Sequence, residues 1–257
     1  MTELSNPRRR LLQRMAGVAG AWLLGGCSRL SQTDWFPQLL GVADQANAAL
    51  AQRIATRRSL APEFSLAEVS ARFPANGNAL PDNADYQKLA ADAFVDYRLE
   101  VDGLVERPAS LSLEEIRSLP SRTQITRHDC VEGWSAIAQW KGARLAALLQ
   151  AVGPLPEARY VVFHCADPMG SDGADPYYES IDLDDAMHEQ TILAYEMNGA
   201  DLPVAHGAPL RLRVERQLGY KHAKYVMRIE LVASFERMRG GRGGYWEDQG
   251  YQWFAGI

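Results

Sequence analysis

The amino-acid sequence predicts a mixed α+β domain that is richer in strands than in helices. Three observations predict this fold class. Several short segments alternate apolar and polar residues with a period of two, which is typical of half-buried strands. Fewer segments show the helical period of 3.6 residues. After residue 90 no internal repeat, low-complexity tract or linker interrupts the chain, so these segments are expected to form one compact unit.

The composition is that of an ordinary folded chain. The 257 residues are 47% hydrophobic and 23% charged, which argues against global disorder and is enough to build a core. The formal net charge of −5 provides no basic field that would recruit nucleic acid. Three cysteines are too few for a disulfide scaffold.

Residues 1–26 contain the parts of an export signal in the right order. Asn6–Gln13 has paired arginines, one spacer and two apolar residues, which is the shape of a twin-arginine signal. Met15–Gly26 carries no charge and is too short for a membrane span, which needs about 20 apolar residues. A basic N-terminal helix is the alternative. Twin-arginine transport carries folded proteins, most often because a cofactor is inserted first, so the signal favours an exported cofactor enzyme.

The signal also sets the expected domain boundaries. Leu24–Cys27 resembles a lipobox and predicts a lipid anchor at Cys27, while its small residues also suit ordinary signal cleavage. Removal of residues 1–26 would leave 23 basic and 31 acidic residues, a net charge of −8. We therefore expect a signal peptide over 1–26, an N-terminal arm with some helix over 27–75, and a functional domain over 76–257 that works in the periplasm.

The first half of the domain is expected to hold two strands and two helices. Tyr97–Gly103 alternates apolar and charged residues and ends in Asp-Gly, which predicts a strand and a turn. Ser112 and Glu115 are spaced as a capping box that opens a short helix. Ile125–Cys130 is expected to be a strand. Gly142–Val152 is amphipathic and ends before Gly-Pro, which predicts a helix.

The second half is expected to be mostly strand. Arg159–Ala166 has a strand pattern, and Ile192–Met197 followed by Asn-Gly predicts a hairpin. Leu210–Glu215 and Val226–Ala233 alternate with a period of two. Ile181–His188 is acidic and is expected to be a short helix.

Cys130 is the most informative candidate for chemistry. It follows a strand and lies beside polar residues and a Gly-Trp turn, where loops commonly carry function. Its thiolate suits a soft metal or a nucleophile, and the alternative is a buried structural cysteine. Cys165 shares a strand face with Val161 and Phe163, which favours core packing. A disulfide between Cys130 and Cys165 is a further alternative in an oxidising compartment.

The second candidate region is basic. His206–Arg211 and Gly219–Lys224 carry cations that can clamp a phosphate through charge-assisted hydrogen bonds. The alternative places Arg211 on the solvated face of its strand. Gly240–Gly244 lacks the strand and helix that frame a nucleotide loop. Zinc is not expected, because no second ligand pair accompanies Cys130 at the usual spacing.

Four motifs together resemble the sulfite oxidase superfamily of molybdenum enzymes. They are Cys130–Ser135, Trp140–Gly142, Gly207–Arg211 and Gly219–Lys224. The resemblance covers roughly residues 73–235. It is greatest to short exported bacterial members of the methionine sulfoxide reductase catalytic subunit type. It implies one molybdopterin-binding domain that transfers an oxygen atom to or from a small or sulfur-containing substrate.

The resemblance also implies a role for individual residues. Cys130 is expected to bind molybdenum, and Arg211 is expected to hold the phosphate of the molybdopterin. The remaining residues for which the resemblance implies cofactor contacts are Asn76, Cys165, His206, His222, Ala223 and Lys224.

Electrons are expected to come from another protein. The chain has no Cys-x-x-Cys-His haem motif and too few cysteines for an iron–sulfur cluster, so a cytochrome or a membrane haem subunit is the expected redox partner. The chain also lacks the cytochrome domain of some relatives, and no length follows Ala233 for a dimerisation domain, so neither a dimer nor sulfite as the substrate is implied. A lipid-anchored binding module and a cysteine-nucleophile hydrolase are the alternative functions.

Overall fold

The structure is a computed structural model that describes residues 32–33, 35–36, 38–43, 59–169 and 175–257. The chain divides into two compact units, Met1–Thr56 and Arg57–Ile257. In the first unit, residues 35–36 and 38–43 are helical. The expected export signal and Cys27 lie outside the described residues. Among the described residues, no helix has the length and apolar character needed to cross a membrane.

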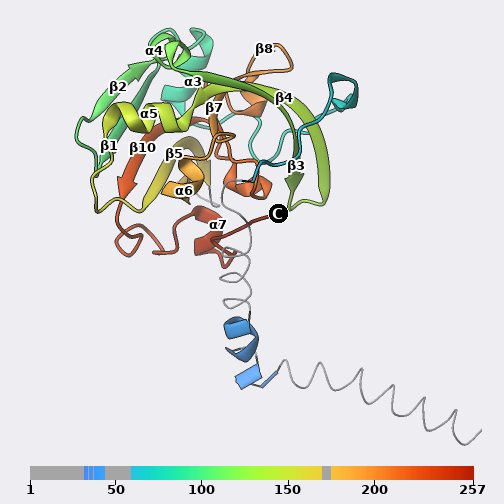
Figure 1. The fold of residues 1–257 in the computed structure, drawn as a ribbon, viewed down its shortest axis with the longest axis vertical. Helices are drawn as coiled ribbons and strands as arrows, with labels where there is room; N and C mark the ends of the chain where they lie inside the picture. The colour runs from blue at the N-terminus through green and yellow to red at the C-terminus, as the bar shows by residue number, and fades with distance from the viewer. Residues whose placement is uncertain (1–31, 34, 37, 44–58, 170–174) are drawn as a thin grey trace, which may run out of the picture. The chain divides into compact units, whose positions relative to one another are not determined.

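Two five-stranded sheets form the frame of the second unit (Figure 1). The first sheet has the order β2-β1-β10-β5-β6, and the second has the order β3-β4-β7-β8 with β9 also paired to β7. β1 and β10 are parallel, and the other described pairs are antiparallel. The strands are Arg98–Gly103 (β1), Ala109–Ser112 (β2), Ser121–Cys130 (β3), Trp134–Arg144 (β4), Tyr160–Met169 (β5), Asp175–Asp182 (β6), Ile192–Met197 (β7), Ala200–Asp201 (β8), Arg211–Arg213 (β9) and Val226–Val232 (β10).

Short helices lie before, between and after the strands. The α-helices are Ala84–Ala91 (α3), Leu113–Ser118 (α4), Leu145–Val152 (α5), Leu183–Ala186 (α6) and Tyr245–Asp248 (α7). The 3₁₀ turns are Leu66–Glu68 (η1), Val204–His206 (η2) and Gly219–Lys221 (η3). The strand-rich α+β prediction is therefore confirmed.

Two of the expected helices form where local sequence signals are strongest. Ser112 caps α4, because its hydroxyl accepts from the Glu115 N–H while the Glu115 carboxylate accepts from the Ser112 N–H. α5 begins at Leu145, three residues later than expected, because Gly142 is paired with Ala194 inside the second sheet. A Cβ on Gly142 would lie 2.2 Å from the Leu193 carbonyl oxygen, so this close strand contact requires glycine.

Two long strands of the structure, β4 and β6, were not expected from the sequence. β4 has small residues at its buried positions, including Ala136 and Ala138, so its period of two is weak in the sequence. β6 extends to Asp182, and the expected helix over Ile181–His188 is wrong at its start. α6 begins only at Leu183, where the Asp182 carboxylate accepts the Asp185 N–H and caps it.

One hydrophobic core joins both sheets. β1, β5 and β10 of the first sheet and β4, β7 and β9 of the second all contribute buried side chains to the same cluster, and so does α5. Burial of so many apolar side chains is the dominant stabilising term in a domain of this size. The core fixes the end of β3 and the loop segments that meet there.

Candidate functional site

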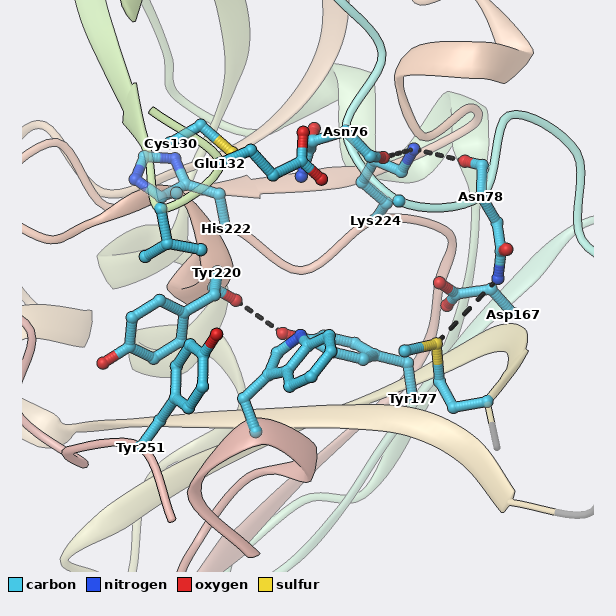
Figure 2. Close-up of a pocket in the computed structure, with 15 residues that line it drawn as sticks. Asn76, Asn78, Cys130, Glu132, Asp167, Tyr177, Tyr220, His222, Lys224 and Tyr251 are labelled. Atoms are coloured by element: carbon cyan, nitrogen blue, oxygen red, sulfur yellow. Dashed lines mark hydrogen bonds between the residues drawn. The ribbon is translucent and has the colours of Figure 1, made fainter. Parts of the chain in front are cut away.

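A cavity of about 260 Å³ lies at the end of β3. Segments far apart in the sequence line it: residues 76–78, the turn after β3, the facing ends of β5 and β6, the η3 segment, and the C-terminal residues Trp246 and Tyr251. Figure 2 shows Asn76, Asn78, Glu132 and Lys224 along one side and tyrosines along the other. The cavity is thus polar on one wall and aromatic on the opposite wall.

Cys130 occupies the last position of β3 and lines this cavity. The turn that follows is closed by a 3.0 Å hydrogen bond from the Gly133 N–H to the Cys130 carbonyl, and Gly133 has a φ of +89° that favours glycine. The thiol is half-buried, and burial raises its pKa. Cys130 and Cys165 are both free thiols, so the alternative disulfide is not formed.

Arg211 is fully buried, which makes the solvated-face alternative wrong. Its guanidinium donates to the His206 carbonyl at 3.2 Å and to Oδ1 of Asn76 at 3.3 Å, and its Nε has no partner. Burial and the neighbouring Arg213 lower the pKa of Arg211 to about 9. Its described hydrogen-bond partners are neutral, so its charge is left for a further group.

Lys224 lies beside Asn76 and Asn78 (Figure 2). Its Nζ donates to three backbone carbonyls, those of Asn76 at 2.7 Å, Asn78 at 2.5 Å and Ala205 at 3.0 Å. Burial and then Arg211 lower its pKa to about 7. In the part of the chain that the structure describes, neither Lys224 nor Arg211 forms a salt bridge with a carboxylate.

Three imidazoles lie around these cations. Nε2 of His128, Nδ1 of His206 and Nδ1 of His222 are buried and have no hydrogen-bond partner. Burial, Arg211 and Lys224 lower the pKa of His206 to about 4, and burial lowers the pKa values of His128 and His222 well below the ordinary range. Near neutral pH all three are uncharged. Their free ring nitrogens and the two cations suit a polar, anionic ligand.

The structure brings together only part of the set expected from sequence. Asn76, Cys130, His222 and Lys224 line the cavity, while Arg211 is not among the lining residues and contacts one of them, Asn76, through a hydrogen bond. His206 packs its ring on Phe73 at 5.6 Å. Cys165 is only 5% exposed and belongs to the hydrophobic core, as its strand pattern predicted. Ala223 is buried, and its carbonyl accepts the Leu212 N–H at 2.8 Å.

Several lining residues were not expected. Tyr220 lies inside the Gly219–Lys224 motif and Tyr251 lies in the aromatic-rich C-terminal tail, so both carried a signal in the sequence. No signal in the sequence indicated that Asp167 and Tyr177 would line the cavity. Burial raises the pKa of Asp167 to about 7, and its Oδ1 has no partner, so this carboxyl is present near neutral pH in both protonation states.

Comparison with known proteins identifies the family. Residues 86–238 match the oxidoreductase molybdopterin binding domain. The chain belongs to this family. It is 37% identical over 249 residues to the provisionally named protein-methionine-sulfoxide reductase subunit YedZ1 of Azospira oryzae, which covers 97% of this chain and 87% of that protein.

Other relatives match a smaller part of the molybdopterin-binding chain. The protein-methionine-sulfoxide reductase catalytic subunit MsrP of Xanthomonas axonopodis pv. citri is 39% identical over 144 residues, 53% of this chain and 45% of MsrP. The solved structure of the sulfane dehydrogenase SoxCD from Paracoccus pantotrophus superposes with a TM-score of 0.50 and 25% identity, over 59% of this chain and 45% of that one. The resemblance to the sulfite oxidase superfamily is confirmed.

The chain is therefore a molybdopterin-dependent oxidoreductase with molybdenum as its metal, and the two alternatives, a binding module and a hydrolase, are wrong. The site fits this cofactor. The Cys130 thiol is a soft donor open to the cavity, and Arg211 and Lys224 offer charge to a phosphate. Cys130 would hold the metal, and the two cations would hold the pterin phosphate.

Alanine at Arg211 or at Lys224 is expected to lower cofactor retention. Arg211→Ala removes one charged hydrogen bond, worth about 1.5–3 kcal/mol, so binding should weaken roughly 10–150-fold. The three N–H donors of Lys224 already contact backbone carbonyls, so Lys224→Ala removes a nearby positive charge and should weaken binding less. The measurement is pterin released per chain after denaturation of the purified variants. Arg98→Ala, at a half-exposed surface pair, is the control and should retain the cofactor. Unchanged pterin content in both site variants would show that neither cation holds the phosphate.

Proposed function

We propose that this chain reduces methionine sulfoxide to methionine. The observation that carries the proposal is its similarity, over 97% of its length, to a protein provisionally named as a methionine-sulfoxide reductase subunit. The shorter similarity to MsrP points to the same substrate. The aromatic wall of the cavity, with Tyr177, Tyr220 and Tyr251, suits a thioether because sulfur and aromatic rings attract one another.

The balance of this reaction defines what the protein has to supply. The sulfur–oxygen bond breaks, two electrons and two protons are consumed, and a thioether and water are released. Molybdopterin with its molybdenum, when bound, supplies the two-electron exchange of an oxygen atom. The chain supplies position and protons. The aromatic wall orients the methyl-sulfur end, and the carboxyl of Asp167, a lining residue with a pKa of about 7, can hold or release a proton.

An assay on the full chain, purified from a molybdenum-replete host, tests the proposal. A reduced viologen dye supplies electrons, and methionine formed is counted by mass spectrometry against dye oxidised. We expect one methionine for every two electrons, and no oxidation of sulfite with an electron acceptor. Protein that contains stoichiometric molybdenum and forms no methionine would refute the proposal, and oxidation of sulfite by that protein would identify sulfite as the substrate instead.

We further propose that the chain works in the periplasm with a separate electron donor. The paired Arg8 and Arg9, the uncharged run to Gly26 and the absence of a haem motif from the sequence support this. Replacing Arg8 and Arg9 by lysine should leave an uncleaved precursor in the cytoplasm, measured by cell fractionation. Acylation at Cys27 should be visible in the mass of the wild-type N-terminus. Export that survives the double change would refute the twin-arginine route, and an unmodified N-terminus would refute the anchor.

A further inference from the structure

The last residues of the chain, 239–257, follow the part that matches the family domain and are nevertheless fixed to it. The Leu218 N–H donates to the Ala255 carbonyl at 2.9 Å, and the Tyr220 hydroxyl donates to the Gln252 carbonyl at 2.6 Å. The buried Lys221 ammonium contacts Glu247 at 2.6 Å. All three anchors lie in or next to the Gly219–Lys224 motif, so the C-terminal segment is attached at the edge of the cavity.

This attachment places two aromatic rings on the cavity wall. Trp246 comes from α7, and Tyr251 follows Gly250, whose φ of +104° allows the chain to turn back. The Tyr251 ring lies 5.3 Å from the ring of Trp246 and 5.3 Å, edge-on, from that of Tyr220. Tyr251 remains 42% exposed while it lines the cavity. It is therefore both in contact with solvent and part of the cavity lining, on the aromatic side with Tyr220 (Figure 2).

The geometry points to Trp246 and Tyr251 as the residues that select the substrate of this site. The inference rests on the proposed function. Aromatic faces carry negative charge density, so they favour a neutral methyl sulfoxide and disfavour a small anion such as sulfite. The polar wall opposite contains Asn76 and Lys224, which are expected to hold the cofactor. The C-terminal segment thus gives the molybdopterin-binding domain of this chain its preference for a sulfoxide that is reduced to a thioether.

Tyr251→Ala tests this assignment in the complete enzyme loaded with cofactor. We expect the KM for methionine sulfoxide to rise roughly 2–10-fold, the factor that corresponds to one lost aromatic contact, with kcat and molybdenum content unchanged. The KM for dimethyl sulfoxide, which carries the same neutral methyl-sulfoxide group, should rise by a similar factor. Tyr251→Phe keeps the ring and should restore the wild-type KM. Val95→Ala, 74% exposed and outside the cavity, is the matched surface control.

The outcomes separate the two proposals. Wild-type enzyme that carries molybdenum and forms no methionine refutes the proposed function and, with it, the selectivity that depends on it. Wild-type turnover combined with an unchanged KM in Tyr251→Ala refutes the selectivity alone. A loss of molybdenum or of thermal stability that parallels the change in KM would also refute it, because the residue would then support the fold and not the substrate.

Discussion

Serine at position 130 is expected to abolish turnover while the fold stays intact. The substitution is nearly isosteric, and Cys130 is half-buried at the end of a strand, so packing changes little. A hydroxyl is a harder and poorer ligand than a thiolate for a soft metal centre. Loss of an outer partner of a metal ligand already costs about 10–100-fold in affinity or activity. Loss of the protein's own sulfur ligand should cost more.

Three measurements check this expectation. Turnover should fall below detection, the absorption spectrum of the purified Cys130→Ser protein should lose its thiolate contribution, and thermal unfolding should match wild type. Full turnover in the variant would show that Cys130 is not the ligand.

Alkylation under denaturing, non-reducing conditions should label both Cys130 and Cys165, because both are free thiols in the structure. If neither is labelled, the two are disulfide-bonded in the isolated protein.

The parts of the fold that the sequence predicted are those with a strong local signal. The period of two over Tyr97–Gly103 and Val226–Ala233 corresponds to β1 and β10, and the capping box at Ser112 opens α4. β4 was missed because alanine at its buried positions hides the alternation. An alternating strand pattern is recognised by the difference in hydropathy between neighbouring residues, and small side chains differ little from their neighbours.

The burial of β9 could not be predicted from its sequence. Arg211 and Arg213 alternate with Leu212, which indicates one solvated face, and yet all three are fully buried. Arg213 is tolerated because Glu215 accepts two of its hydrogen bonds, at 2.8 and 2.5 Å, and His128 Nδ1 lies 2.9 Å away. The His128 contact spans 85 positions of the chain and therefore has no local signature.

The site residues that lie within the recognised motifs were predicted from the sequence. Those that lie outside the motifs were not. Cys130, His222 and Lys224 stand in motifs and line the cavity. Cys165 was expected near the cofactor from the resemblance and in the core from its strand pattern, and the structure places it in the core. Asp167 and Tyr177 reach the cavity through the pairing of β5 with β6, which a single sequence does not display.

Methionine at position 221 is expected to lower the free energy of unfolding by about 3–5 kcal/mol. The Lys221 ammonium is fully buried between two carboxylates, 2.5 Å from Glu179 and 2.6 Å from Glu247. Methionine fills similar space and removes the only cation paired to them among the described residues. Two carboxylates without a counter-charge are then left in the interior. Since domains are typically stable by about 5–15 kcal/mol, denaturant titration of the full chain should show the loss readily.

Two comparisons separate charge from packing in Lys221→Met. Arg98→Met removes a cation from an exposed pair with Glu115 and should cost at most about 1 kcal/mol. Adding Glu247→Gln to Lys221→Met removes one uncompensated charge and should recover part of the stability. If the double variant is no more stable than the single one, lost packing explains the effect.

The pH dependence of Lys221→Met has a definite sign. Burial raises the pKa of Glu179 well above its ordinary value, and Lys221 opposes that shift, so its removal raises the pKa further. A carboxyl whose pKa is higher in the folded than in the unfolded chain destabilises the fold above its ordinary pKa and ceases to do so below it. The stability difference between Lys221→Met and wild type should therefore shrink as the pH is lowered through the range around the raised pKa of Glu179 in the folded wild-type protein. A difference that is constant over this range would mean that the two carboxylates are not the cause.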